Sequence, residues 1–266
     1  MRADIEYAEN GAFLDLYLAA PREIAREHGI DVLETAGAAC GAVRALSGSS
    51  MFNRVMGLEL DREATDADLG RIEGFYARVG ARYVVAVSRQ AERRGLAGRL
   101  EERGFTPDYG WAKFLRGVEP PPPVETELVV EEIGLRRAAD FGWIVADGYG
   151  LPDFVAAWAA TVVGRPGWTC FLAFVGDQPA AAAALHVAHG VGWLGFAATL
   201  PPFRRLGAQG ALLAARIERA AELGCTAVTT ETGELVEGRP SDSYRNILRA
   251  GFELVYVRPN YLSPAA

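Results

Sequence analysis

Four consecutive prolines at positions 120–123 constrain the fold of this 266-residue chain more than any other feature of its sequence. Proline lacks a backbone N–H and has a fixed φ, so the run fits neither a helix interior nor a central strand. It favours an extended polyproline segment instead. The segments on either side are similar in length, and each is long enough for a small core. We therefore predict domains at 1–118 and 127–266, joined by a proline-rich linker at 119–126.

The two halves share an order of patterns that indicates duplication. Each contains a helix, a glycine, a strand, a second helix that ends at Gly-Phe, and a final strand. Glycine suits the left-handed position that often ends a helix. In the first half the pattern comprises a helix at 69–79, a strand at 83–87 and Gly104-Phe105, and in the second half a helix at 213–221, a strand at 226–230 and Gly251-Phe252.

The second half also predicts a mixed sheet. Its apolar and aromatic runs, separated by turn residues, favour an antiparallel meander of three strands. The helix that follows is a crossover, which favours parallel pairing of the next strand. Alanine prefers helix, but the run at 180–184 is short and follows a turn, so we predict strand there. The predicted elements are helices at 135–149 and 152–163 and strands at 168–175, 180–188 and 192–200.

Composition and charge exclude several classes of function. The formal charge of −7 argues against a broad nucleic-acid footprint, which needs clustered Lys and Arg. The three cysteines are widely spaced and favour a reducing compartment. No apolar run approaches the ~20 residues that span a bilayer, and the acidic first ten residues do not resemble a signal peptide. We expect a cytoplasmic protein that binds neither membrane nor nucleic acid. We expect no metal, because His186 and His189 have no other ligand type near them in sequence.

The loop before the helix at 213–221 carries the clearest chemical signal. Pro201 and Pro202 end a strand, and Arg204 begins a segment with two glycines that leads into the helix. Backbone N–H groups and the helix dipole attract anions at such a position, and arginines add full charges. The segment therefore predicts a site for a phosphate or pyrophosphate. It matches neither the dinucleotide fingerprint nor the P-loop. A helix start whose glycines serve packing alone is the alternative.

This segment resembles motif A of the GNAT superfamily of acyl-CoA-dependent N-acyltransferases. That motif is Arg or Gln, two residues, Gly, one residue, then Gly or Ala, after a strand that ends in x-Pro-x-x-Arg. Arg204, Gly207 and Pro201 match it, whereas Gln209 stands at the third anchor. The order of elements also resembles the GNAT fold over most of residues 127–262. The resemblance implies an α/β fold (α+β mixed sheet) with two GNAT-like domains, each a mostly antiparallel sheet flanked by helices.

The resemblance also implies where acetyl-CoA, the expected cosubstrate, would bind. Main-chain amides of the loop would hold the pyrophosphate, and the end of the preceding strand would pair with the pantetheine as an added strand does. Asn246 would lie near the coenzyme. The implied coenzyme-binding residues are Ala197, Ala198, Thr199, Leu200, Arg204, Arg205, Leu206, Gly207, Ala208, Gln209, Gly210, Ala211 and Asn246.

The implied reaction is direct transfer of an acetyl group to an amine, which needs a base because most aliphatic amines are protonated at neutral pH. Glu231, at the end of a strand, is the first candidate, with a solvated loop carboxylate as the open alternative, and Glu234 and Asp147 are weaker candidates. Many GNAT proteins have a Tyr acid where this sequence has Ile247. Tyr244, one turn earlier, is a candidate substitute, although the pattern favours an ordinary packed aromatic.

The first half lacks the glycine pair and carries an acidic segment at 61–68, so we predict no coenzyme there. The predicted protein is therefore a tandem GNAT-like N-acetyltransferase, monomeric or homodimeric, that acts on a primary amine of a small molecule or peptide. Three alternatives remain open. They are an acetyl-CoA-binding module without catalysis, a noncatalytic interaction protein, and an acyltransferase that uses a longer acyl-CoA or a thiol-bearing sugar amine, as mycothiol-synthase-like tandem proteins do.

Overall fold

The computed structural model describes residues 4–237 and 241–265, which fold into two compact units. Unit 1 comprises Met1–Trp111 and Val257–Ala266, and unit 2 comprises Ala112–Tyr256. The proline-rich linker at 119–126 thus lies inside unit 2 and not between the units. The boundaries differ from the predicted domains because two strands, β5 (Thr106–Arg116) and β11 (Glu253–Leu262), are each divided between the units.

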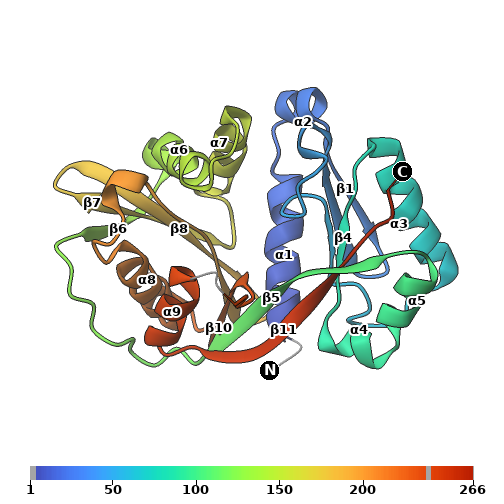
Figure 1. The fold of residues 1–266 in the computed structure, drawn as a ribbon. Helices are drawn as coiled ribbons and strands as arrows, with labels where there is room; N and C mark the ends of the chain where they lie inside the picture. The colour runs from blue at the N-terminus through green and yellow to red at the C-terminus, as the bar shows by residue number, and fades with distance from the viewer. Residues whose placement is uncertain (1–3, 238–240, 266) are drawn as a thin grey trace. The chain divides into compact units, whose positions relative to one another are not determined.

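Unit 1 contains a mixed sheet with the strand order β1-β2-β3-β4-β11 (Figure 1). Its pairings are antiparallel except for β3–β4, which is parallel and is reached through helix α3. The elements are α1 (Asp4–Leu18), α2 (Arg22–His28), β1 (Ile30–Thr35), β2 (Ala38–Val43), η1 (Arg44–Leu46), β3 (Arg54–Met56), α3 (Asp66–Val79), β4 (Val84–Ala86), α4 (Arg89–Arg93) and α5 (Leu96–Glu102).

Unit 2 contains a second mixed sheet with the order β5-β10-β9-β8-β7-β6. The pairings from β6 to β9 are antiparallel, and β9–β10 is parallel and is reached through helix α8. The elements are β6 (Val129–Ile133), η2 (Leu135–Arg137), α6 (Ala138–Tyr149), α7 (Asp153–Ala159), η3 (Ala160–Val162), β7 (Trp168–Val175), β8 (Gln178–Ala188), β9 (Val191–Thr199), η4 (Pro201–Phe203), α8 (Ala208–Glu222), β10 (Ala227–Gly233) and α9 (Asp242–Arg249).

The predicted meander and crossover are confirmed in unit 2, and unit 1 repeats them. Each unit has antiparallel strands, then a crossover helix, then a parallel strand. The final strands are exchanged, however. The strand beside β4 is β11, from the end of the chain, and the strand beside β10 is β5, from its first half. Residues 112–116 of β5 therefore complete the sheet of unit 2, which the sequence did not predict.

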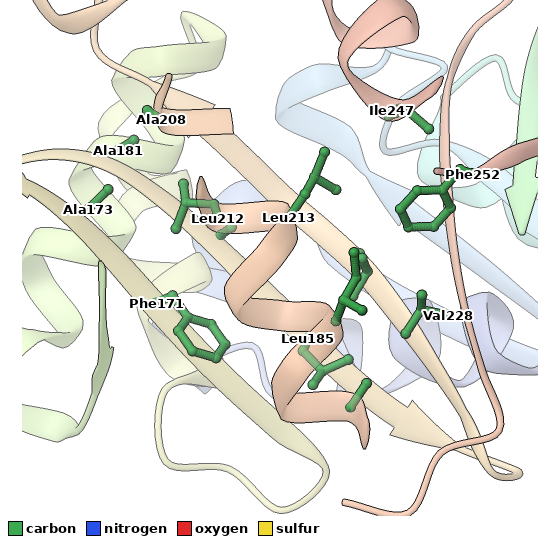
Figure 2. Close-up of a cluster of buried hydrophobic side chains, with 14 of the residues drawn as sticks. Phe171, Ala173, Ala181, Leu185, Ala208, Leu212, Leu213, Val228, Ile247 and Phe252 are labelled. Atoms are coloured by element: carbon green, nitrogen blue, oxygen red, sulfur yellow. The ribbon is translucent and has the colours of Figure 1, made fainter. Parts of the chain in front are cut away.

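The core of unit 2 forms where α8 packs on the sheet (Figure 2). Leu212 and Leu213 of α8 lie against side chains of β7, β8 and β10. The alanine run 180–184 is a fully buried strand, as predicted, because α6 packs on one face of β8 and α8 on the other. Small side chains let both helices approach the sheet closely. Among the described residues, no helix combines the length and the apolar character that crossing a bilayer requires.

A buried charge cluster anchors α1 to the last strand within unit 1. Arg258 of β11 is fully enclosed, and its guanidinium donates to Glu6 at 2.8 Å and to Glu9 at 2.7 and 2.8 Å. Both glutamates are also buried. A buried carboxylate without its cation is strongly unfavourable, so this cluster ties the two ends of the chain together.

We expect Arg258→Met to lower the free energy of unfolding by ~3–5 kcal/mol, because it leaves two buried carboxylates without their guanidinium. Arg78→Met is the matched control, since Arg78 is exposed, donates to the Gly74 carbonyl of its own helix and lies over the Phe75 ring. The control should change the free energy by about 0.5 kcal/mol or less. Urea denaturation followed by circular dichroism measures both. Equal effects would contradict the anchoring role.

Candidate active site

Strands β9 and β10 separate partway along their length. Their parallel register runs from Val191 and Ala227 to Trp193 and Thr229. Immediately beyond, the Thr230 hydroxyl donates to the Leu194 carbonyl at 2.8 Å. Strand β8 continues to pair with β9 as far as Thr199. Within the described part of the chain, residues 195–199 therefore have a strand neighbour on one edge and none on the β10 side.

A bulge lies at this separated end of β9. Phe196 adopts a left-handed φ of 54°, and the register between β8 and β9 shifts between Ala182 and Ala184. Left-handed geometry is costly for a non-glycine residue and is often found at functional sites. The Tyr149 hydroxyl of α6 donates to the Ala197 carbonyl at 2.9 Å, and Arg204 Nε reaches the Thr199 carbonyl at 3.4 Å. A ligand that pairs with this strand would compete with these two donors.

In the described part of the chain, the loop after β9 presents main-chain amides without an acceptor. Arg205 has a φ of 69° and Gly207 a φ of 87°, and α8 begins at Ala208. The first main-chain bond of the helix runs from the Ala211 N–H to the Gly207 carbonyl at 3.0 Å. Among the described residues, the N–H groups of 205–210 make no main-chain hydrogen bond. Such a row of amides at a helix N-terminus suits an anion.

The corresponding helix of unit 1 has no such opening. The Thr65 side chain caps α3 by accepting from the Asp68 N–H, and Asp68 accepts from the Thr65 N–H in return. Arg62 donates to both oxygens of Asp68, at 2.8 and 3.1 Å. These hydrogen bonds, first from Arg62 and then from Thr65, hold the pKa of Asp68 well below its usual value. The N-terminus of α3 is thus already occupied by a carboxylate from its own chain.

The two loop glycines of unit 2 also have a packing role. A Cβ at Gly207 would come within 3.0 Å of Thr126, and a Cβ at Gly210 within 3.1 Å of Val124. The Thr126 hydroxyl donates to the Leu206 carbonyl at 2.6 Å. The end of the linker therefore lies against the loop. The packing interpretation that the sequence left open is accordingly part of the explanation for these glycines.

Gln209, at the position where the family has Gly or Ala, bridges α8 to α9. Its amide nitrogen donates to the Ser243 hydroxyl at 3.0 Å, and its amide oxygen accepts from Asn246 at 2.8 Å. Asn246, which the resemblance implies as a coenzyme contact, thus lies beside the loop with its amide bonded to Gln209.

Glu231 lies on β10 beyond the point where β9 and β10 separate. Its carboxylate accepts from Lys113 Nζ at 3.2 Å and from the Trp193 indole N–H at 3.0 and 3.1 Å. Lys113 is fully buried and comes from β5, the strand exchanged from the first half. The Trp193 ring covers Gly195, where any Cβ would come within 1.9 Å of it. The carboxylate is therefore held in one orientation between a cation and an indole.

The remaining catalytic candidates do not gather around this carboxylate. Tyr244 is buried in the core, with its ring edge-on to Phe114 at a centroid distance of 4.8 Å. Ile247 is buried in the same core. Asp147 is exposed on α6, and Glu234 follows the end of β10. The packed-aromatic interpretation of Tyr244 agrees with this placement.

Four residues near the separated strands were missed by the sequence analysis: Lys113, Tyr149, Trp193 and Arg216. Arg216 has only 1% of its surface exposed, and its guanidinium donates to main-chain carbonyls of α8, β8 and β9. Burial lowers the pKa of Arg216 to about 9. One signal was available for Arg216, since it stands four residues after Leu212 on the apolar side of its helix. No local sequence pattern distinguishes Lys113, Tyr149 or Trp193.

Comparisons with known proteins identify the fold. The acetyltransferase (GNAT) family model matches residues 138–237, which include β9, the amide loop and Glu231. Residues 138–237 form a GNAT-family domain. Proteins of this family transfer an acyl group from acyl-CoA. The match lies within unit 2. A search of curated proteins gave no match. In the described residues no group of three or more His, Cys, Asp or Glu side chains is arranged to hold a metal ion.

Solved structures extend the similarity beyond the GNAT domain to the full chain. A GCN5-related N-acetyltransferase from Kribbella flavida superposes with a TM-score of 0.68 at 18% identity, covering 100% of this chain and 96% of that one. A second, from Sphaerobacter thermophilus, gives 0.59 at 16% identity, with coverages of 100% and 95%. A tandem GNAT protein from the clavulanic acid biosynthesis pathway gives 0.59 at 14% identity, with coverages of 99% and 97%. These superpositions establish a shared fold, including its tandem arrangement.

We expect Gly195→Ala to displace the Trp193 indole and weaken its bond to Glu231, which lowers the free energy of unfolding by ~1–3 kcal/mol. Gly70→Ala in α3 is the control, because a Cβ there meets open space. Alanine should stabilise that helix by ~0.5–1 kcal/mol. Urea denaturation measures both. A neutral Gly195→Ala would show that the indole does not need the glycine.

Proposed function

We propose that this protein is an N-acetyltransferase that transfers the acetyl group of acetyl-CoA to a primary amine of a small molecule or peptide. The proposal rests on one observation, the separation of β9 from β10. The amide loop follows β9, and the oriented Glu231 carboxylate lies on β10. These are the two features that direct acyl transfer needs, namely an anchor for the anionic coenzyme and a proton acceptor for the amine.

The proposed coenzyme site comprises the end of β9 and the start of α8. The amides of 205–210 would donate hydrogen bonds to the pyrophosphate, with Arg204 and Arg205 adding charge. Main-chain groups of Ala197–Leu200 would align the pantetheine beside β9. Donors from Tyr149 and Arg204 already reach two of these carbonyls, so binding would exchange those hydrogen bonds. Gln209 and Asn246 would border the site from the side of α9.

Glu231 is the proposed base. The neutral amine attacks the thioester carbon, a nitrogen–carbon bond forms, the carbon–sulfur bond breaks with its electron pair going to sulfur, and the amine proton passes to the carboxylate. Lys113 and Trp193 keep the carboxylate oriented before substrate binds. They are positioning residues in this scheme, because they touch the base and not the reacting atoms.

Unit 1 is proposed to be a degenerate GNAT-like domain. The Asp68 carboxylate and the Thr65 cap already fill the N-terminus of its crossover helix. An incoming pyrophosphate would meet a negative charge where unit 2 offers free amides. The first half is accordingly proposed to bind no coenzyme.

A second candidate function is an acetyl-CoA-binding module without turnover. One observation favours it, since Tyr244 is packed in the core and Ile247 replaces the usual acid. Release of coenzyme A thiol, measured across a panel of amines, separates the two functions. Tight binding of acetyl-CoA without thiol release would favour the module.

We expect Arg204→Ala and Gly210→Asp each to weaken acetyl-CoA binding by ~1–3 kcal/mol, through the loss of a cation or the gain of an anion beside the pyrophosphate. Arg219→Ala is the control, because it removes an arginine from the other end of the same helix. Isothermal titration calorimetry measures all three variants. If both site variants bind as tightly as the control, the loop is not the coenzyme site.

We expect Glu231→Gln to lower kcat by about 100-fold and to remove the rise of rate with pH, while the affinity for acetyl-CoA stays unchanged. Lys113→Met should instead move that rise to higher pH, because a carboxylate without its cation holds a proton more strongly. Rates of thiol release between pH 6 and 9 measure both variants. A wild-type profile for Glu231→Gln would remove this residue from the mechanism.

A further inference from the structure

Arg216 is a cation enclosed within unit 2 whose hydrogen bonds use only part of its guanidinium. Nε donates to the Leu212 carbonyl at 2.8 Å. Nη1 donates to the Ala184 carbonyl at 3.3 Å and to the Gly195 carbonyl at 3.2 Å. Within the described residues, Nη2 makes no hydrogen bond. Nη2 is not among the fully enclosed polar atoms without a partner, so its two N–H groups remain available to a ligand.

The charge of Arg216 is not matched by any carboxylate within salt-bridge distance in the described part of the chain. A buried ion without a counter-ion costs several kcal/mol, and burial accordingly lowers the pKa of Arg216 to about 9. The groups that face it from β8 and β9 are main-chain carbonyls. The titratable group that interacts with it is the Tyr149 phenol from α6, which also interacts with Glu231. The neutral phenol does not supply the missing negative charge.

The position of this cation relates it to the proposed reaction. Gly195, whose carbonyl binds Nη1, is the first residue of β9 beyond Leu194, to which Thr230 bonds as the strands separate. Phe196 forms the bulge next to it, and Ala197 begins the edge at which the pantetheine is proposed to pair. The guanidinium therefore lies at the β8–β9 bulge beside Gly195, about two turns of α8 beyond the pyrophosphate loop.

We propose that Nη2 of Arg216 binds a negatively charged atom at the acyl end of the coenzyme. This inference rests on the proposed acyl-CoA site. Two sources have this chemistry. One is the thiolate that leaves when the carbon–sulfur bond breaks, and the other is a terminal carboxylate on a dicarboxylic acyl group. Either would pair a buried cation with an anion that is present only when ligand is bound or the reaction proceeds.

The test compares four ligands by isothermal titration calorimetry: coenzyme A, desulfo-coenzyme A, acetyl-CoA and succinyl-CoA. If the thiolate is the bound anion, coenzyme A releases a proton on binding at pH 8 and desulfo-coenzyme A does not. Titrations in two buffers of different ionisation enthalpy measure this proton release. If a carboxylate is the bound anion, succinyl-CoA binds about tenfold more tightly than acetyl-CoA, the advantage of one charge-assisted hydrogen bond. Both results are obtained with the wild-type protein.

Arg216→Met should abolish whichever preference the wild type has, and Arg216→Lys should retain part of it. Arg219→Met is the matched control on the same helix, since Arg219 pairs with Glu132 and Glu222 and should keep the wild-type ratios. If Arg216→Met does not fold, the Lys variant and the wild-type ratios still decide the question.

The inference is overturned if wild-type protein binds coenzyme A without releasing a proton and shows no preference for succinyl-CoA. It is also overturned if Arg216→Met changes the affinity for all four ligands by the same factor, because that result indicates a purely structural side chain. Failure of the wild-type protein to bind any of the four ligands would instead refute the proposed function itself.

Discussion

The separation of β9 from β10 is the constraint on which the candidate site of unit 2 depends. Parallel pairing ends at Trp193 and Thr229, and side chains from both strands then occupy the gap. The Thr230 hydroxyl bonds to β9, and the Trp193 indole lies over Gly195 and bonds to Glu231. Unpaired backbone must find other partners. One edge of β9 is consequently left for a ligand, and the residues that hold the strands apart are also those that orient the proposed base.

The exchange of terminal strands links the first half of the chain to this chemistry. Because β5 is the neighbour of β10, Lys113 reaches Glu231 although 118 positions separate them in sequence. Burying a lysine beside a carboxylate costs little free energy only while both charged groups are present. The duplicated architecture therefore has a structural consequence within unit 2 itself, since a GNAT domain that began at residue 127 and ended at residue 256 would lack this cation.

Sequence patterns predicted most of the fold and part of the site. Apolar runs bounded by turn residues located β7, β8 and β9, and glycines located the ends of α3 and α8, because these signals act over a few residues. The amide loop was found for the same reason. Lys113 was missed because its role depends on strand exchange, which leaves no local pattern. Trp193 was missed because the position of its indole over Gly195 depends on the side-chain rotamer. Gln209 was interpreted only as a departure from the motif, although it bridges to Asn246.

The crossover helices α3 and α8 begin from equivalent places in their sheets, yet their N-termini differ in charge. In α3, Thr65 and Asp68 saturate the first turn, and Arg62 fixes the carboxylate there. In α8 the first amides of the described chain make no main-chain hydrogen bond, and Arg204 and Arg205 precede them in sequence. Arg216, two turns further along α8, adds a buried cation beneath the point where β9 leaves β10. A duplicated fold thus keeps its geometry in both copies, whereas the electrostatic preference for an anion is concentrated along one helix, from its exposed start to its buried middle.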